Sequence, residues 1–337
     1  MRTDEFDYTL PEEAIAQSAI EPRDDSRLLV LEGLVDRRFS DLPDVLRSGD
    51  LLVVNRTRVR AARLVGQRRP GGGKTEILLT QRVDPRRWQA LLRPAAKLHA
   101  GSVVDCATLT ATLLTDPVDG VATVNVESPG DVEEAIEQSG TIPLPPYFKG
   151  TLEDPERYQT IFAQAVGSAA APTAALHFTR DLLDALALAG IGIAEVELEV
   201  GLDTFRPMTT ERVESHRMHT ERIHVDGNVV QAVEATRAGG GRIVAVGTTV
   251  VRSLESASPT KGVLEEFEGP TSLFIRPGYE TRIVDALVTN FHAPRTTLLV
   301  MLAALVGDRW RTAYEHALGN GYRFLSFGDA MYLEVGR

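Results

Sequence analysis

The chain has 337 residues, 43% of them apolar and 25% charged, a composition typical of soluble globular proteins and a length that favours two domains. Its single cysteine, Cys106, excludes disulfide frameworks, cysteine-rich zinc sites and cysteine-bound iron–sulfur clusters. The formal charge of −11 argues against indiscriminate nucleic-acid binding, although a local basic face remains compatible with it. The acidic start of the chain lacks a signal-peptide core, and the longest apolar run, 298–306, is too short to cross a bilayer. We therefore expect a cytoplasmic protein.

Residues 1–60 predict mixed α/β structure. We expect short strands at 27–31 and 51–54, with a helix N-cap at Ser40 and Asp41 between them. A basic run follows the second strand, with no acidic residue between positions 56 and 75; it contains Arg56, Arg58, Arg60, Arg63, Arg68, Arg69 and Lys74. Such a run forms either a solvated basic face or a set of phosphate contacts.

The segment 61–150 differs from the mixed α/β pattern before it, because short strand-like runs recur between Gly, Pro and Asp turns. The expected strands are 76–79, 88–92, 103–106, 109–114 and 121–126. This spacing is typical of a small β-barrel or sandwich. We therefore predict that 61–150 is an inserted all-β domain, and that 1–60 and 151–337 together form an α/β core domain.

Residues 151–337 return to alternating helices and strands. The helices are expected at 156–164, 182–189, 225–238, 250–257, 296–305 and 309–318. The strands are expected at 195–200, 242–246, 273–275 and 283–289, with a last extended segment at 322–333. Thr179 precedes one of these helices at the position of an N-cap.

The stretch 195–221 is equally compatible with an acidic edge strand followed by an ordinary turn and with a strand that leads into a functional loop. Its first residues alternate between apolar and acidic, as in a half-buried strand, and lead into a loop that ends at Pro207. His216 and His219 follow shortly afterwards. Together with Glu221 and His224 they could bind a metal, but the spacing does not match helical zinc pairs and no cysteine is nearby. Proton transfer is the better interpretation of these histidines.

The stretch 246–253, V-G-T-T-V-V-R-S, joins a buried strand to a helix. Thr248 and Thr249 lie at the expected helix N-terminus, where free backbone N–H groups and hydroxyls can hold an anion, and Arg252 follows one turn later. An ordinary threonine N-cap is the equally weighted alternative.

Several motifs along nearly the whole chain resemble, in order, those of the S-adenosylmethionine:tRNA ribosyltransferase-isomerase family of queuosine biosynthesis. The motifs are N-R-T-R-V-R-A-A-R-L (55–64), P-L-P-P-Y (143–147), Y-Q-T-I-F-A (158–163), A-A-P-T-A-A-L-H-F (170–178), V-G-L-D-T-F-R-P (200–207), H-R-M-H-T-E (216–221), V-G-T-T-V-V-R-S-L-E-S (246–256), L-F-I-R-P-G-Y (273–279), V-T-N-F-H-A-P (288–294) and Y-R-F-L-S-F-G-D-A-M (322–331).

This resemblance implies a mixed α/β (barrel-like) core interrupted by a small all-β barrel domain. It also implies that S-adenosylmethionine is a co-substrate that donates its ribosyl unit to 7-aminomethyl-7-deazaguanine at the wobble position of a tRNA. Adenine and methionine leave, and epoxyqueuosine-tRNA results. We expect a monomer that acts on tRNA, without a metal and without a membrane.

The reaction needs proton transfer beside a sulfonium, a site for the methionine carboxylate and flat pockets for the bases. On motif position, the candidates for catalysis are His177, His216, His219, His292 and Glu199. The candidates for binding S-adenosylmethionine or RNA are Asn55, Arg58, Arg63, Pro172, Thr173, Phe178, Asp203, Thr204, Phe205, Thr248, Thr249, Arg252, Asn290 and Asp329.

The chain departs from the family pattern near the expected site. The family reads L-H-V-G-x-G-T-F where this chain has Glu199 for the histidine and Asp203 for the second glycine, and Ala175 replaces a glycine in the 170–178 motif. These changes favour two alternatives to the family reaction: a diverged paralog that uses S-adenosylmethionine with a small-molecule acceptor, and a non-catalytic protein that binds RNA or ligand.

Overall fold

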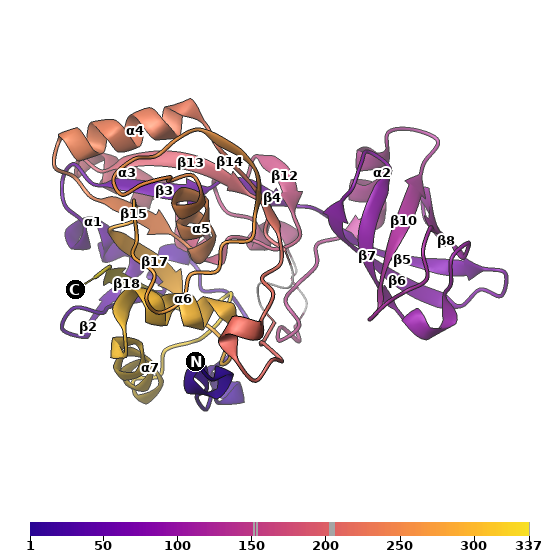
Figure 1. The fold of residues 1–337 in the computed structure, drawn as a ribbon, viewed down its shortest axis with the longest axis horizontal. Coiled ribbons are helices and arrows are strands. Elements are labelled where there is room, and N and C mark those ends of the chain that lie inside the picture. The colour runs from indigo at the N-terminus through magenta and orange to yellow at the C-terminus, as the bar shows by residue number, and fades with distance from the viewer. Residues whose placement is uncertain (151, 153, 202–205, 337) are drawn as a thin grey trace. The chain divides into compact units, whose positions relative to one another are not determined.

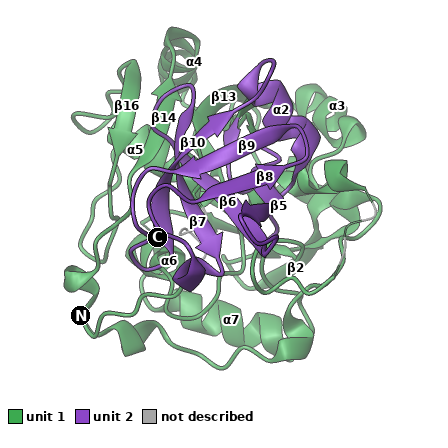
Figure 2. Cartoon of the chain, turned by 90° about the vertical axis from the view of Figure 1, so that its right-hand side faces the viewer, with its two compact units in different colours: residues 1–58, 145–166, 171–337 green, residues 59–144, 167–170 purple. Residues whose placement is uncertain are grey.

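The computed structural model describes residues 1–150, 152, 154–201 and 206–336. It divides into two compact units, coloured separately in Figure 2. Unit 1 comprises residues 1–58, 145–166 and 171–337, and unit 2 comprises residues 59–144 and 167–170. Each unit has its own hydrophobic core.

Unit 1 is built on one mixed β-sheet (Figure 1). From edge to edge its strands are β16 (Phe267–Thr271), β14 (Glu221–Val225), β13 (Gly192–Leu198), β3 (Leu51–Asn55), β15 (Ile243–Val246), β17 (Ala286–Asn290), β18 (Ala330–Glu334), β1 (Arg27–Val30) and β2 (Val35–Arg38). The neighbours β13, β3, β15 and β17 run parallel. Every residue of β3, β15 and β17 is buried, as expected for parallel strands covered on both faces.

Alternate strand residues pack into two cores on the two faces of this sheet. In β3, Leu51 and Val53 belong to one core, and Leu52 and Val54 to the other. The first core also takes apolar residues of α4 (Gly227–Ala238), α5 (Thr248–Ser256), α6 (Thr297–Val306) and α7 (Arg309–Gly319). The second takes those of α1 (Leu42–Val45) and α3 (Arg180–Leu188). The α/β class predicted from the sequence is therefore confirmed.

Short 3-10 helices supplement these elements; they are η1 (Thr3–Phe6), η2 (Glu12–Ala14), η3 (Arg23–Asp25), η4 (Phe39–Asp41), η6 (Pro155–Tyr158), η7 (Thr173–His177) and η9 (Val213–Ser215). The expected N-cap of α3 is confirmed, because the Thr179 hydroxyl accepts the N–H of Leu182 at 3.1 Å. The expected helix 156–164 is wrong. Only η6 forms there, and at the end of the stretch the Gln164 N–H bonds the Arg56 carbonyl at 2.9 Å.

Two other local expectations also differ from the structure. The strand expected at 273–275 is not formed, and the edge strand β16 lies earlier, at Phe267–Thr271, where it pairs with β14. The extended segment expected at 322–333 is a strand only in β18. In both places the available pairing partner, and not the local apolar pattern, decides where the strand forms.

Unit 2 is an all-β barrel. Its sheet runs β11 (Gly140–Thr141), β5 (Arg63–Arg69), β6 (Lys74–Arg82), β7 (Arg87–Arg93), β10 (Val121–Glu127), β9 (Leu109–Leu113) and β8 (Val103–Cys106). β8 also pairs with β5, which closes the barrel, and α2 (Val132–Ser139) packs against it. Outside both sheets, β4 (Thr57–Val59) pairs with β12 (Ala165–Ser168).

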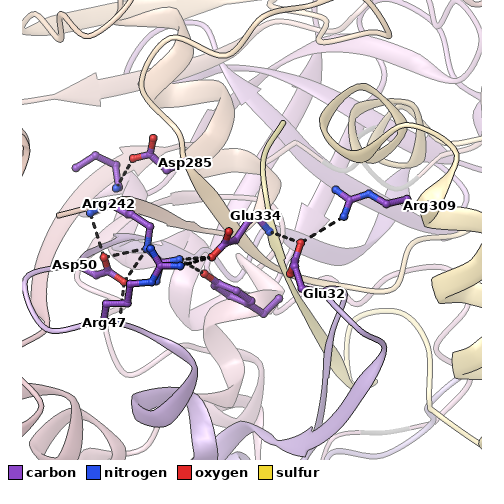
Figure 3. A network of polar contacts seen from close by, with 9 residues as sticks. Glu32, Arg47, Asp50, Arg242, Asp285, Arg309 and Glu334 are labelled. Carbon is purple, nitrogen blue, oxygen red and sulfur yellow. Dashed lines mark hydrogen bonds and ion pairs between the residues drawn. The ribbon is translucent and has the colours of Figure 1, made fainter. Parts of the chain in front are cut away.

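A network of ion pairs closes the amino-terminal edge of the central strands (Figure 3). Arg242, just before β15, bonds Asp50 before β3 at 2.5 Å and Glu334 at the end of β18 at 2.5 Å. Asp285, just before β17, accepts the N–H of Ile243 at 2.7 Å. These contacts align the strand starts. The opposite edge, formed by the carboxyl ends of the parallel strands, is where open α/β sheets bind ligands.

Candidate active site

Polar side chains collect at the carboxyl ends of the parallel strands. Asn55 ends β3, Thr248 and Thr249 follow β15, and Asn290 ends β17, with His292 two residues beyond it. Because the strands are parallel neighbours, these residues lie along the same sheet edge.

Two adjoining hollows open at this edge, with volumes of about 290 and 360 Å³. They share Thr173, Asn290, His292 and Leu298 as lining residues. The first is also lined by Tyr147, Phe291, Ala293, Thr296, Leu325 and Ser326, and the second by Ala171, Pro172, Ala174, Val200, Gly247, Thr248, Thr249 and Thr289. Every one of these residues belongs to unit 1.

Asn290 is held in one orientation at the centre of this edge. Its Oδ1 accepts the Thr173 hydroxyl at 2.9 Å, while its Nδ2 donates to the Leu325 carbonyl at 3.3 Å. The same Nδ2 lies 3.3 Å from Nε2 of His177. Because Nδ2 can only donate, Nε2 of His177 is the acceptor, and its proton is on Nδ1, which donates to Ser26 Oγ at 2.7 Å.

His177 is a neutral, buried ring in this arrangement. It stacks on Phe39 with 4.8 Å between ring centroids, and only 5% of its surface is exposed. Burial, assisted by the charges of Arg157 and Arg323, lowers the pKa of His177 to about 3. Its position behind Asn290 suits it to orient that amide.

His292 borders both hollows and is also neutral, because burial lowers its pKa to about 3. Its Nε2 lies 3.1 Å from the Thr289 hydroxyl, and its backbone is fixed by Tyr314, whose hydroxyl accepts the His292 N–H at 2.8 Å. The other ring nitrogen, Nδ1, has no hydrogen-bond partner among the described residues. Depending on which ring nitrogen carries the proton, Nδ1 of His292 can donate a hydrogen bond to a ligand or accept one from it.

Thr249 contributes an open polar group at the N-terminus of α5. Its Oγ1 is buried and has no hydrogen-bond partner within the part of the chain that the structure describes. The first N–H groups of an α-helix have no partners inside the helix. An unpaired hydroxyl beside such groups fits an anionic or carboxylate ligand, which was one of the two equally weighted interpretations of this position.

Arg252, expected to bind a carboxylate or phosphate, is buried and contacts other groups of the protein interior. Its Nη1 bonds Glu221 Oε2, and its other nitrogens donate to the carbonyls of Leu273 and Thr271. Both charged side chains of the pair are almost fully buried. Arg252 therefore ties α5 to β14, and it is not among the residues that line the two hollows.

Glu221 also receives contacts from the polar segments before it. Its Oε1 accepts the Gly201 N–H at 3.0 Å and lies 3.2 Å from Nε2 of His219. Burial alone would raise the pKa of Glu221, but the His219 hydrogen bond and the Arg252 charge outweigh it and lower the pKa. The sequence singled out Glu221 only as a metal ligand; its role as the centre of this network was missed.

Other predicted site residues stabilise the core. Asn55 links β3 to β13, because its Nδ2 donates to the Leu198 carbonyl at 2.9 Å and its Oδ1 accepts the Leu198 N–H at 3.2 Å. The Phe178 ring is fully buried between Phe39 and Phe162, so it packs in the core and does not face a hollow. Asp329 is buried and accepts backbone N–H groups.

The remaining candidates lie away from the hollows or outside the described residues. His216 packs against the Phe274 ring, and burial and the nearby His219 lower its pKa. The Glu199 N–H pairs with the Arg222 carbonyl beside β14. Asp203, Thr204 and Phe205 fall outside the described residues. Ala175 is buried in η7.

The basic run that follows β3 is largely neutralised by ion pairs. Within unit 1, Arg56 pairs with Glu197 and Arg58 with Glu156. Within unit 2, three further pairs form: Arg60 with Glu133, Arg63 with Glu76 and Arg69 with Asp105. Five of the seven basic residues of the run thus have a carboxylate partner, and both interpretations from the sequence, a solvated basic face and a set of phosphate contacts, stay predictions.

Sequence reasoning did not identify Tyr147, Ser326 or Ser26 as site residues. Tyr147 and Ser326 line the first hollow and share a 2.5 Å hydrogen bond. Both lie within motifs that carried the family resemblance, so their motif positions were the available signal. Ser26, which orients His177, lies in no such motif.

Neither a metal centre nor a membrane span is apparent. Among the described residues, no group of three or more His, Cys, Asp or Glu side chains is placed to hold a metal ion. No helix in that same part of the chain is long and apolar enough to cross a membrane.

Comparison with known proteins identifies the family. The sequence profile of the family described as "Queuosine biosynthesis protein" matches residues 3–333. The chain is 48% identical to the S-adenosylmethionine:tRNA ribosyltransferase-isomerase of Symbiobacterium thermophilum, covering 99% of this chain and 100% of that protein. It is 49% identical to the enzyme of the same name from Methylobacterium radiotolerans, covering 100% and 98%.

The fold also matches a solved structure. The crystal structure of the S-adenosylmethionine tRNA ribosyltransferase from Thermotoga maritima is 38% identical and superimposes with a TM-score of 0.56, covering 98% of this chain and 99% of that one. At these identities and coverages the resemblance seen in the sequence motifs is confirmed, and the chain belongs to the queuosine biosynthesis protein family.

Proposed function

We propose that the protein transfers and isomerises the ribosyl unit of S-adenosylmethionine onto 7-aminomethyl-7-deazaguanine at the tRNA wobble position, giving epoxyqueuosine-tRNA, adenine and methionine. The main support is a polar site at the carboxyl ends of the parallel strands, in a chain that matches S-adenosylmethionine:tRNA ribosyltransferase-isomerases over its whole length.

The two hollows differ in the chemistry they offer to the parts of S-adenosylmethionine. The Thr249 side has an unpaired buried hydroxyl at a helix N-terminus, which suits the methionine carboxylate. Half of the residues that line the first hollow are apolar or aromatic, namely Tyr147, Phe291, Ala293, Leu298 and Leu325, which suits a flat base. His292, whose ring borders both hollows, is the residue we assign to proton transfer.

Asn290 and His177 are assigned a positioning role. The Asn290 amide is oriented by Thr173 from one side and by His177 from the other, so its place in the shared wall of the hollows is fixed before a ligand binds. Such pre-organisation lowers the cost of aligning reacting groups. We further propose that the core, 1–60 and 151–337, is the catalytic domain and that 61–150 is an inserted domain.

Release of adenine tests this function directly. The protein is incubated with S-adenosylmethionine and a tRNA that carries the aminomethyl-deazaguanine base, and adenine is measured by chromatography. Release that requires the modified tRNA is the expected result. Release with the free base and without tRNA would instead indicate a small-molecule acceptor. Binding of S-adenosylmethionine with no release under either condition would indicate a non-catalytic protein.

A further inference from the structure

A third hollow lies beside His177, next to the candidate active site. It is lined by the arginine cluster, defined here as Arg23, Arg157 and Arg323, together with Ser26, His177 and Ser326. Ser326 also lines the first hollow of the active site, so the two cavities share a wall. These residues all belong to unit 1.

The guanidinium groups of the cluster are held mainly by backbone carbonyls, which leaves much of their charge uncompensated. Arg23 donates to the carbonyls of Gln159 at 2.7 Å and of Glu156 at 3.3 Å. Arg157 donates to the carbonyl of Ile20 at 2.6 Å. Carbonyl acceptors fix the position of an arginine without neutralising it, so the cluster is rigid and positively charged.

Arg323 completes the cluster and has an unused donor. It donates to the carbonyls of Ser18 at 3.0 Å and Phe327 at 3.1 Å, while its buried Nε has no partner within the described part of the chain. Its nearest carboxylate, Asp329, is 4.0 Å away and accepts the backbone N–H groups of Arg27 and Arg323.

The acidic residues near the cluster are engaged elsewhere, with one exception. Asp24 accepts the Thr179 hydroxyl, Asp25 and Glu156 pair with Arg38 and Arg58, and Asp154 accepts the Glu156 N–H. The carboxylates of Asp154 and Glu156 still act on Arg23 electrostatically. The exception is Glu21, which pairs with Arg157. The Glu21 side chain is 67% exposed, whereas that of Arg157 is only 15% exposed. An exposed carboxylate on a fixed arginine can be displaced by an incoming anion.

We propose that Arg23, Arg157 and Arg323 bind a backbone phosphate of the RNA substrate, with Glu21 occupying Arg157 until the RNA arrives. The proposal rests on the proposed function. A phosphate fits the cluster better than the methionine carboxylate does, because Arg157 already has a tethered carboxylate that a free one would not outcompete. A phosphate can bridge several guanidinium groups, and a polyanion gains further affinity from counterion release.

This site would also connect RNA binding to the active site. The positive charges of Arg157, Arg323 and Arg23 act on His177, whose ring contacts Ser26, Phe39 and Asn290. A bound phosphate would offset those charges beside the residue that orients Asn290.

The test measures binding of a fluorescein-labelled anticodon stem-loop RNA by anisotropy at several salt concentrations. We expect Arg157→Gln and Arg323→Gln each to weaken RNA binding about 5- to 20-fold and to reduce the slope of log K against log salt by roughly 0.7 to 1. Glu21→Gln should tighten RNA binding about 2- to 5-fold, because it frees Arg157. The affinity for S-adenosylmethionine should change far less than the affinity for RNA in all three variants.

Arg222→Gln is the matched control, since Arg222 forms an exposed pair with Glu268 in the same unit. The proposal is overturned if the cluster variants bind RNA with the affinity and salt slope of Arg222→Gln, or if Glu21→Gln weakens RNA binding. Loss of S-adenosylmethionine affinity in Arg157→Gln would assign the cluster to the carboxylate instead. A wild-type protein that binds RNA through the cluster but releases no adenine would contradict the proposed function alone.

Discussion

At the scale of single residues, the environments of the histidines separate their roles. His177 and His292 are both buried and neutral, but His177 has a partner on each ring nitrogen, whereas His292 leaves Nδ1 open beside both hollows. His219 faces the Glu221 carboxylate and takes part in the interior network. His292 is thus distinguished from the other two histidines by a ring nitrogen, Nδ1, that can contact a ligand.

We expect His292→Gln to lower the rate of adenine release by about 100- to 10,000-fold, the usual contribution of a proton-transfer residue. The affinity for S-adenosylmethionine should change by less than about 5-fold, because glutamine keeps a polar side chain of similar size. Single-turnover adenine release and calorimetric binding measure the two effects. His99→Gln is the control, since His99 is exposed in unit 2. A rate within about 3-fold of wild type would remove His292 from catalysis.

At the scale of elements, two contacts decide how neighbouring strands and helices join. In unit 1, the start of β14 alternates between buried Glu221, which pairs with Arg252 of α5, and exposed Arg222, which pairs with Glu268 of β16. In unit 2, the closure of the barrel requires a glycine in β5, because β8 passes directly over Gly66.

Glu221→Gln should lower the free energy of unfolding by about 3–5 kcal/mol, because it leaves the Arg252 charge buried without its partner. Arg222→Gln breaks the adjacent exposed pair and should have a far smaller effect, since solvent screens that pair. Urea denaturation of the two variants measures the difference. Equal effects of the two substitutions would show that the Glu221–Arg252 pair does not hold α5 against β14.

Gly66→Ala should destabilise the barrel by about 1–3 kcal/mol, because an added Cβ would lie 2.5 Å from Cys106 Sγ and closer still to the Asp105 carbonyl. Gly73→Ala, in the hairpin between β5 and β6, is the control, since its nearest atom would be 3.6 Å away. Faster hydrogen exchange in β5 and β8 of Gly66→Ala alone is the expected observation. Unchanged exchange in Gly66→Ala would mean that β5 and β8 accommodate the added Cβ without destabilising the barrel.

At the scale of the whole molecule, the two units bury their apolar side chains in different ways. Unit 1 covers both faces of a mixed sheet with helices, and its polar network closes one edge and leaves the other for ligands. Unit 2 curls a sheet into a barrel around its own apolar interior. Burial in unit 1 extends to ionisable groups, and their titration affects the stability of the fold.

Stability should fall as the pH falls below about 6.5. The pKa of His177 and of His292 is lowered from 6.5 to about 3, so between these values the unfolded chain binds protons that the folded chain does not. By proton linkage, each histidine then lowers the free energy of unfolding by up to about 1.4 kcal/mol for each pH unit of acidification. Urea denaturation at pH 7.5, 6 and 5 measures this loss. A flat profile, or histidine ring NMR signals that titrate near pH 6.5, would contradict it.

Local patterns in the sequence were sufficient for the fold class, the barrel strands β6 to β10 and the cap at Thr179, but they did not predict β5 or β11. Apolar periodicity and turn residues determine whether a segment prefers a helix or a strand. Burial of the apolar face then favours the same secondary structure. The failure at 156–164 shows the limit of this information. There a helix-compatible stretch is fixed instead by a long-range hydrogen bond from Gln164 to Arg56.

The sequence by itself determined the family, the α/β core with its β-barrel, and the segments that supply the candidate site. The tertiary structure alone decided which side chains of those segments face a ligand. Arg252 and Phe178 are buried in the protein interior, whereas Thr249, His292, Tyr147 and Ser326 line the hollows. The physical reason is that a side chain's partner, such as Asn290 for His177 at a separation of 113 residues, depends on strand order and register, which no local pattern encodes.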